Sequence, residues 1–223
     1  MQCLDTKKEQ SCHQSVTKSS NKILYSRSNH SIIKQQQIIM NIQTESTPNP
    51  SSLKFLPGKI VMEKETADFR NVEEAKSSPF ALNLFKIDGV EGVFFGSDFI
   101  SITKGDNHEW QMLKSPISET IIECYKSGTA IMLDKEENTS DTSNTEDTEA
   151  VIKIKKIIDT QVRPAVAKDG GDITFKSFDN GIVYLQMKGS CSGCPSSTAT
   201  LKAGIENMLK HYIPEVREVR PVT

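Results

Sequence analysis

The stretch DGGDITFKSFDNGIVYLQMKGSCSGCP, residues 169–195, decides how the last third of the chain folds. Asn180-Gly181 lies near its centre and favours a two-residue hairpin turn, because both central residues of such a turn need a positive φ. On either side, apolar residues alternate with polar ones over 173–175 and 183–187, as they do in half-buried strands. The pattern predicts a β-hairpin that leads directly into a loop containing two cysteines.

Helices are predicted on both sides of this hairpin. Apolar residues recur at helical spacing from Val151 to Val162, and Pro164 is expected to kink or restart the helix before residues 169–172 end it. After the cysteine loop, a second apolar stripe runs from Leu201 to Met208, and residues 215–220 are compatible with a last short strand. The predicted order is helix, strand, strand, cysteine loop, helix, strand, which is an α+β unit.

An acidic run divides the chain. Residues 134–149, DKEENTSDTSNTEDTE, contain seven acidic residues, one lysine and no apolar residue. Such a segment cannot bury enough surface to offset the entropy of ordering it. We therefore expect a flexible acidic linker between two small α+β domains that move independently, at 41–133 and 150–223. Residues 1–40, rich in Ser, Gln, Asn and Lys, are expected to be a disordered tail or a targeting segment.

The first domain is expected to mix strands and helices. Ser78-Pro79 predicts the start of a helix and Asp88-Gly89 its end. The short runs 92–95 and 99–103, separated by Gly-Ser-Asp, predict a hairpin, and a second helix is expected from Ser115-Pro116 to about Gly128.

Composition excludes several classes of protein. No stretch of the 223 residues approaches the roughly 20 apolar residues of a membrane-spanning helix. With 27 Lys and Arg against 29 Asp and Glu, charge gives no reason to expect nucleic acid or an anionic membrane as a partner. Five cysteines, an odd count with no secretory signal peptide expected, favour a reducing compartment over a disulfide framework. No catalytic triad, phosphate-binding loop or pair of catalytic carboxylates stands out, so we expect no enzyme.

Cys191 and Cys194 are the candidate metal ligands. They lie where a predicted helix begins, and the unpaired backbone N–H groups there favour thiolates. Only Ser192 and Gly193 separate them, so both sulfur atoms are able to point at one soft metal. One pair supplies two ligands, whereas a structural zinc or an iron–sulfur cluster normally has four. We therefore expect a second copy of the loop, in a homodimer, to supply the other two.

The other cysteines are not expected to bind metal. Cys124 lies on the apolar face of a predicted helix, as a small core residue does, while Cys3 and Cys12 match no metal-binding spacing. Two alternative interpretations of the Cys191–Cys194 pair remain open. A thiol–disulfide oxidoreductase uses the same Cys-X-X-Cys arrangement, and a structural zinc ion shared by a dimer would use the same ligands.

Several segments resemble a known family. The sequences RPAVAKDGGDI at 163–173 and GSCSGCPSSTATLKAGIENMLKHYIPEV at 189–216 resemble the C-terminal domain of NifU-like (Nfu-type) iron–sulfur cluster scaffold proteins. The sequences QTESTPNPSSLKFLPG at 43–58, SPFALNLFKIDGV at 78–90 and GVFFGSDFISITK at 92–104 resemble the N-terminal domain of that family.

The resemblance implies a carrier that holds a [4Fe-4S] cluster between two protomers through Cys191 and Cys194 and passes it to apo-proteins. Lipoate synthase, aconitase-type enzymes and respiratory-complex subunits are the implied recipients, and cluster-donor assembly machinery is the implied source. The cysteine domain is most similar to alphaproteobacterial members, so a bacterial cytoplasmic protein is expected. The mitochondrial matrix is the alternative if residues 1–39 act as a presequence.

Overall fold

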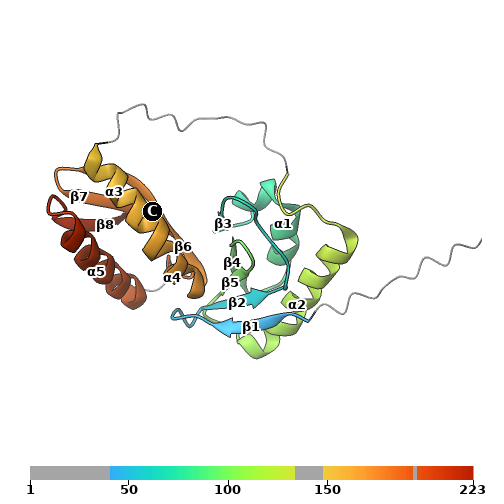
Figure 1. Ribbon diagram of the computed structural model, residues 1–223. Helices are drawn as coiled ribbons and strands as arrows, with labels where there is room; N and C mark the ends of the chain where they lie inside the picture. Colours follow the sequence, from blue (N-terminus) through green and yellow to red (C-terminus); the bar gives the residue numbers. More distant parts are fainter. Residues whose placement is uncertain (1–40, 134–147, 193–194, 223) are drawn as a thin grey trace, which may run out of the picture. The chain divides into compact units, whose positions relative to one another are not determined.

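The computed structural model describes residues 41–133, 148–192 and 195–222. They form two α+β domains, which confirms the predicted fold class (Figure 1). We call residues 41–133 the N-terminal domain and residues 148–222 the C-terminal domain. Most of the expected acidic linker and all of the expected tail at 1–40 lie outside the described residues.

The N-terminal domain is built on an antiparallel sheet with the strand order β1-β2-β5-β4-β3. These strands are β1 (Gln43–Ser46), β2 (Ser52–Leu56), β3 (Ala67–Phe69), β4 (Val90–Phe95) and β5 (Ile100–Lys104). Two helices, α1 (Pro79–Phe85) and α2 (Trp110–Ser127), cover one face of the sheet (Figure 1). A 3₁₀ turn, Glu74–Ser77, precedes α1. Alternate residues of the central strands, such as Phe55, Phe95 and Ile102, pack against these helices and form the core.

The local signals of this domain mostly hold. The Ser78 side chain accepts a hydrogen bond from the Ala81 N–H (3.0 Å) at the start of α1. β4 and β5 pair as the predicted hairpin. The prediction for α2 is wrong at its start, because the helix begins at Trp110 and contains Pro116 in its second turn. The earlier start is stabilised from outside the helix, since the Trp110 indole N–H donates to the Pro50 carbonyl (3.0 Å).

The C-terminal domain has the predicted order of elements. A helical segment consists of α3 (Glu149–Ile157), a π-helical turn (Ile158–Val162) and α4 (Arg163–Lys168). A three-stranded sheet and the last helix follow, as β6 (Gly171–Asp179), β7 (Ile182–Gly189), α5 (Pro195–Tyr212) and β8 (Glu218–Val222). β7 pairs antiparallel with β6 and parallel with β8. Every second residue of β7 is buried in one core with residues of all these helices, so the helices cover the same face of the sheet.

Two backbone features of this domain follow from the sequence as expected. Asn180 and Gly181 have φ values of 49° and 80°, which the predicted hairpin turn requires. Pro164 lies at the start of α4, directly after the π-helical turn, because a residue without an N–H cannot continue the regular hydrogen-bond ladder.

Candidate metal centre

The cysteine loop starts where β7 ends. Gly189 has a φ of 63°, which a residue with a side chain rarely adopts, and it turns the chain out of the sheet. The Ser192 N–H and the Ser192 hydroxyl both donate to the Gly189 carbonyl, at 3.1 and 2.8 Å. This tight turn fixes Cys191 between the end of the strand and the start of α5.

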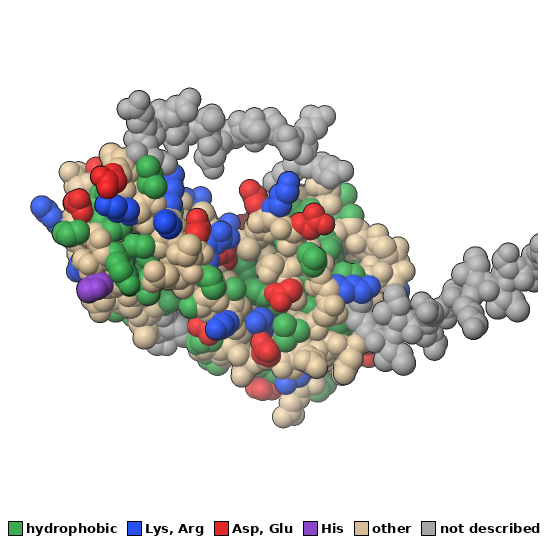
Figure 2. Space-filling model, viewed as in Figure 1, with side chains coloured by type: hydrophobic (Ala, Val, Ile, Leu, Met, Phe, Trp, Pro, Cys, Tyr) green, Lys and Arg blue, Asp and Glu red, His purple; other side chains and the backbone are tan. Residues whose placement is uncertain are grey.

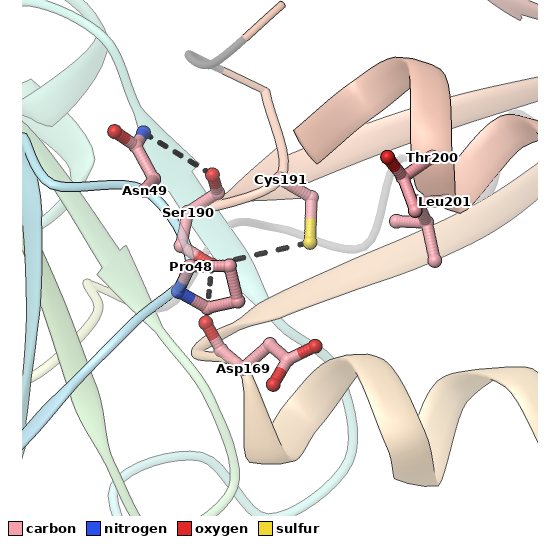
Figure 3. Close-up of a pocket in the computed structure, with 7 residues that line it drawn as sticks. All are labelled: Pro48, Asn49, Asp169, Ser190, Cys191, Thr200 and Leu201. Atoms are coloured by element: carbon pink, nitrogen blue, oxygen red, sulfur yellow. Dashed lines mark hydrogen bonds between the residues drawn. The ribbon is translucent and has the colours of Figure 1, made fainter. Parts of the chain in front are cut away.

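Cys191 lies against the first residues of β6 and lines a cavity. Its side chain packs against the backbone of Gly171, and only 6% of the residue is exposed. The Ser190 hydroxyl lies 3.9 Å from the Cys191 sulfur (Figure 3). The cavity has a volume of about 350 Å³, and its lining residues are Pro48, Asn49, Asp169, Ser190, Cys191, Thr200 and Leu201. Cys191 is thus nearly buried, but it forms part of the wall of this cavity.

The protonation of Cys191 differs from the sequence-based expectation of a thiolate. The pKa of the Cys191 thiol is raised to about 11, and burial is the largest cause. The hydrogen bond with Ser190 lowers this pKa, and the carboxylates of Asp169 and Asp172 contribute to raising it. The described part of the loop therefore holds a protonated thiol. Loss of water around the sulfur is the largest cause, and it depends on tertiary burial that the sequence alone does not reveal.

An ion pair beneath the loop joins α4 to β6. The Arg163 guanidinium donates to both carboxylate oxygens of Asp172, at 2.8 and 3.0 Å. Asp172 also accepts from its neighbour's N–H at Ile173 (2.8 Å) and from the Thr66 hydroxyl (2.8 Å). Burial opposes ionisation of Asp172, but these hydrogen bonds outweigh it and lower the pKa of the carboxyl. The pair holds the start of β6, and so Gly171, against Cys191.

The cysteines singled out by the sequence lie in different places. Cys191 lines the cavity, whereas Cys194, Cys3 and Cys12 lie outside the described residues. Cys124 is buried in the core of the N-terminal domain, as the sequence suggests, and its sulfur accepts from the Asn83 amide at 3.5 Å. Within the described ranges, no three His, Cys, Asp or Glu side chains lie close enough together to hold a metal ion.

Sequence reasoning missed Asn49 and the role of Asp172. Residues 169–172 were expected to be a helix-ending turn, and Asp169 and Gly170, the latter with a φ of 81°, do end α4. Asp172 is the second residue of β6, and its carboxylate pairs with the Arg163 guanidinium. The spacing of nine residues between them crosses a helix end, so no regular period reveals the pair.

Comparison with known proteins assigns both domains. Residues 42–128 match the family model described as "Scaffold protein Nfu/NifU N terminal", and residues 154–220 match that of the "NifU-like domain". The human NFU1 iron-sulfur cluster scaffold homolog, mitochondrial, is 49% identical over 184 residues, which cover 82% of this chain and 72% of the human protein. The chain belongs to the NifU-like iron–sulfur cluster scaffold family.

A plant relative of this NifU-like protein agrees with that result. NifU-like protein 4, mitochondrial, from Arabidopsis thaliana is 53% identical over 188 residues, which cover 82% of this chain and 66% of the plant protein. The match thus spans about two thirds of the length of these relatives. A solution NMR structure of a NifU-like protein from Saccharomyces cerevisiae is 25% identical, with a TM-score of 0.41, and covers 50% of this chain and 98% of that chain.

The family membership confirms the predicted role in iron–sulfur cluster assembly, and the family is one of scaffold proteins rather than of known enzymes. The expectation of a bacterial cytoplasmic protein is wrong. The relatives from Arabidopsis, Drosophila willistoni and human are all named as mitochondrial proteins. The expectation rested on similarity within the cysteine domain and on the position of Met40, whereas the relatives that match over both domains are named as mitochondrial.

The surface carries charged side chains of both signs. On the face that Figure 2 shows, Lys and Arg side chains are interspersed with Asp and Glu side chains. Among the described residues, none of the helices combines the length and the apolar character needed to cross a membrane.

Proposed function

We propose that this protein carries a [4Fe-4S] cluster as cargo, held between two copies of the chain by Cys191 and Cys194 of each, and transfers it to apo-proteins. The observation that carries the proposal is the position of Cys191 in a NifU-like domain, at the wall of a cavity and next to the start of α5. Each chain then supplies two thiolates of the four that such a cluster takes.

The protonated state of Cys191 bears on both proposed chemistries. Metal ligation needs the thiolate, so loading releases a proton and becomes more favourable as pH rises. A redox-active cysteine instead needs a low pKa and exposure, and Cys191 has neither. Burial of the Cys191 thiol thus disfavours both chemistries in the metal-free chain. Membership of a scaffold family is what supports cluster carriage over thiol–disulfide exchange.

The direct test is anaerobic reconstitution of the full chain with iron and sulfide. The wild-type protein should bind about four iron and four sulfide per two chains. Cys191→Ser and Cys194→Ser should lose this cluster, whereas the matched control Cys124→Ser should keep it, because Cys124 lies in the other domain's core. A stable cluster in Cys191→Ser would overturn the ligand assignment, and zinc in protein purified without oxygen would favour the structural-zinc alternative.

Transfer requires a separate measurement. Loaded wild-type protein should restore the activity of an apo aconitase-type enzyme, and it should do so in the presence of a chelator that captures free iron. A redox enzyme would instead reduce insulin in its metal-free form and gain no visible absorbance on reconstitution.

We further propose a mitochondrial matrix location, supported by the names of the relatives. Residues 1–40 fused to a fluorescent reporter should direct it to mitochondria, and a reporter that stays in the cytosol would contradict this.

Residues 134–149 are proposed as the linker between the domains. Deletion of 136–147 should leave cluster assembly nearly unchanged, because this run holds no residue suited to a core.

A further inference from the structure

The face of the N-terminal sheet opposite α1 and α2 is also buried, although these two helices do not cover it. Phe94 is only 1% exposed and Ser101 only 2%, yet neither belongs to the core that α1 and α2 cover. Side chains alternate across a strand, so Phe94 points away from Phe95 and from the helices. Another part of the chain must therefore cover this face.

Four residues form a row across this face, one on each of four neighbouring strands. The strand registers pair Lys54 with Ser101, Ser101 with Phe94, and Phe94 with Asp68. We call these four residues the docking row. Because directly paired residues lie on the same face, all four are presented to whatever packs there.

The docking row contacts the backbone on both sides of the cysteine loop. Lys54 donates to the Lys168 carbonyl (3.4 Å), and Ser101 donates to the Gly170 carbonyl (2.7 Å). Asp68 accepts from the Gly189 N–H (3.3 Å). Phe94, the remaining member of the row, packs its ring against Gly189: a Cβ added to Gly189 would lie 2.8 Å from the ring.

The loop before β2 reaches the cysteine loop itself. The buried Asn49 side chain donates to the carbonyl of Ser190, the residue next to Cys191, at 3.2 Å (Figure 3). Its own side-chain oxygen accepts from the Ser51 N–H (3.0 Å), which holds the amide in this orientation. Pro48 and Asn49 thus form one wall of the cavity that Cys191 lines.

We propose that the docking row holds the N-terminal domain against the cysteine loop, and that this contact competes with the second copy of the chain that a shared cluster requires. The inference rests on the proposed function. A cluster ligated by two copies needs each cysteine loop to face its partner, whereas the docked N-terminal domain occupies one side of that loop. The contact combines single hydrogen bonds to backbone groups with the packing of Phe94 on Gly189 and the Thr66–Asp172 hydrogen bond. Relative domain motion is the default for polar interfaces of this kind within a chain.

The test compares cluster loading by full-length Ser101→Glu with loading by the wild type. Glu does not fit at this position, since a Cβ on Gly170 would already lie 2.7 Å from the Ser101 hydroxyl. Ser115→Glu, the same change at an exposed position of α2, is the matched control. Loss of the Ser101 hydrogen bond alone would raise the undocked fraction by about fivefold. Because Glu also clashes there, the initial rate of cluster incorporation should rise by at least that factor. An unchanged or slower rate overturns the inference.

A second pair of variants covers the case in which Ser101→Glu does not fold. Asp68→Lys places a cation near Arg70 and Lys188, both of which attract the native carboxylate, and should also speed loading. Asp68→Asn keeps an oxygen that accepts from Gly189 and should load as the wild type does. Equal rates for the two variants would contradict docking through this residue.

Two further measurements separate this inference from the proposed function. Hydrogen exchange at the Gly189 amide, followed without any cluster, should be faster in Ser101→Glu than in the wild type. Equal exchange means that the docked state does not exist in solution, and only this inference falls. If Ser101→Glu still loads a cluster after Cys191→Ser is added, the ligand assignment falls, and the docking inference falls with it.

Discussion

Gly171→Ala tests how closely β6 packs against the candidate ligand. Gly171 is the first residue of β6 and pairs with Gly189 across the hairpin. A Cβ added there would lie 2.6 Å from the Cys191 sulfur and 2.7 Å from the Lys188 carbonyl oxygen. Real Cβ atoms do not approach other atoms so closely, so either the cysteine loop or the strand must move.

The expected cost follows from the kind of atoms involved. One contact is with backbone, which cannot rotate away, and overpacking of this kind costs about 1–3 kcal/mol. For a domain of this size each kcal/mol lowers the thermal midpoint by about 4–8 °C. Because the Cys191 sulfur is one of the two atoms that the added Cβ would contact, the variant should also lose a reconstituted cluster faster than the wild type does.

The assay is thermal unfolding of the metal-free protein by circular dichroism, followed by the rate of cluster loss after reconstitution. Gly204→Ala is the matched control, since Gly204 lies within α5 and a Cβ there meets no atom within 4 Å. This variant should be more stable than the wild type by about 0.5–1 kcal/mol, because glycine disfavours a helix interior. If Gly171→Ala has the thermal midpoint and the rate of cluster loss of the wild type, the described packing around Cys191 is refuted.

Three other variants probe the remaining features. Arg163→Ala should lower the free energy of unfolding by about 2 kcal/mol at pH 7, because it leaves Asp172 buried without its partner. Folding lowers the pKa of Asp172, so this loss should shrink as pH falls below about 4. Urea unfolding that gives the same difference at pH 3 would contradict this. Burial raises the pKa of Asp68, so its ionised form opposes folding at neutral pH. Asp68→Asn should therefore raise the thermal midpoint at pH 7 but not at pH 3. A rise at pH 3 without one at pH 7 would exclude this explanation. Cys124→Ala should cost about 1 kcal/mol of stability and leave the iron content unchanged, so a loss of iron would show that the core cysteine takes part in binding.

Local sequence signals predicted those parts of the fold that depend on a few neighbouring residues. The Asn180-Gly181 turn, the Ser78 cap and the order of elements in the C-terminal domain are of this kind. β1 was not predicted, because all of its residues are exposed and no apolar alternation marks it. β3 is only three residues long, which is too short for a period to show.

For the candidate site, the sequence offers the cysteine pair as a prediction, and the structure describes only Cys191 of the two. The spacing of Cys191 and Cys194 points to metal chemistry, but the raised pKa of Cys191 depends on burial beneath residues distant in sequence. The docking row is invisible in the sequence for a similar reason. Its four members lie on four strands and come together only through the registers of the sheet.

We propose that one cluster is shared by two chains through Cys191 and Cys194. Native mass spectrometry of the anaerobically reconstituted full chain gives the most direct test. We expect a species with the mass of two chains plus one [4Fe-4S] cluster, which is absent from Cys191→Ser and present in Cys124→Ser. A cluster on a single chain, or a dimer of Cys191→Ser that still carries the cluster, would show that the two cysteines do not share it in this way.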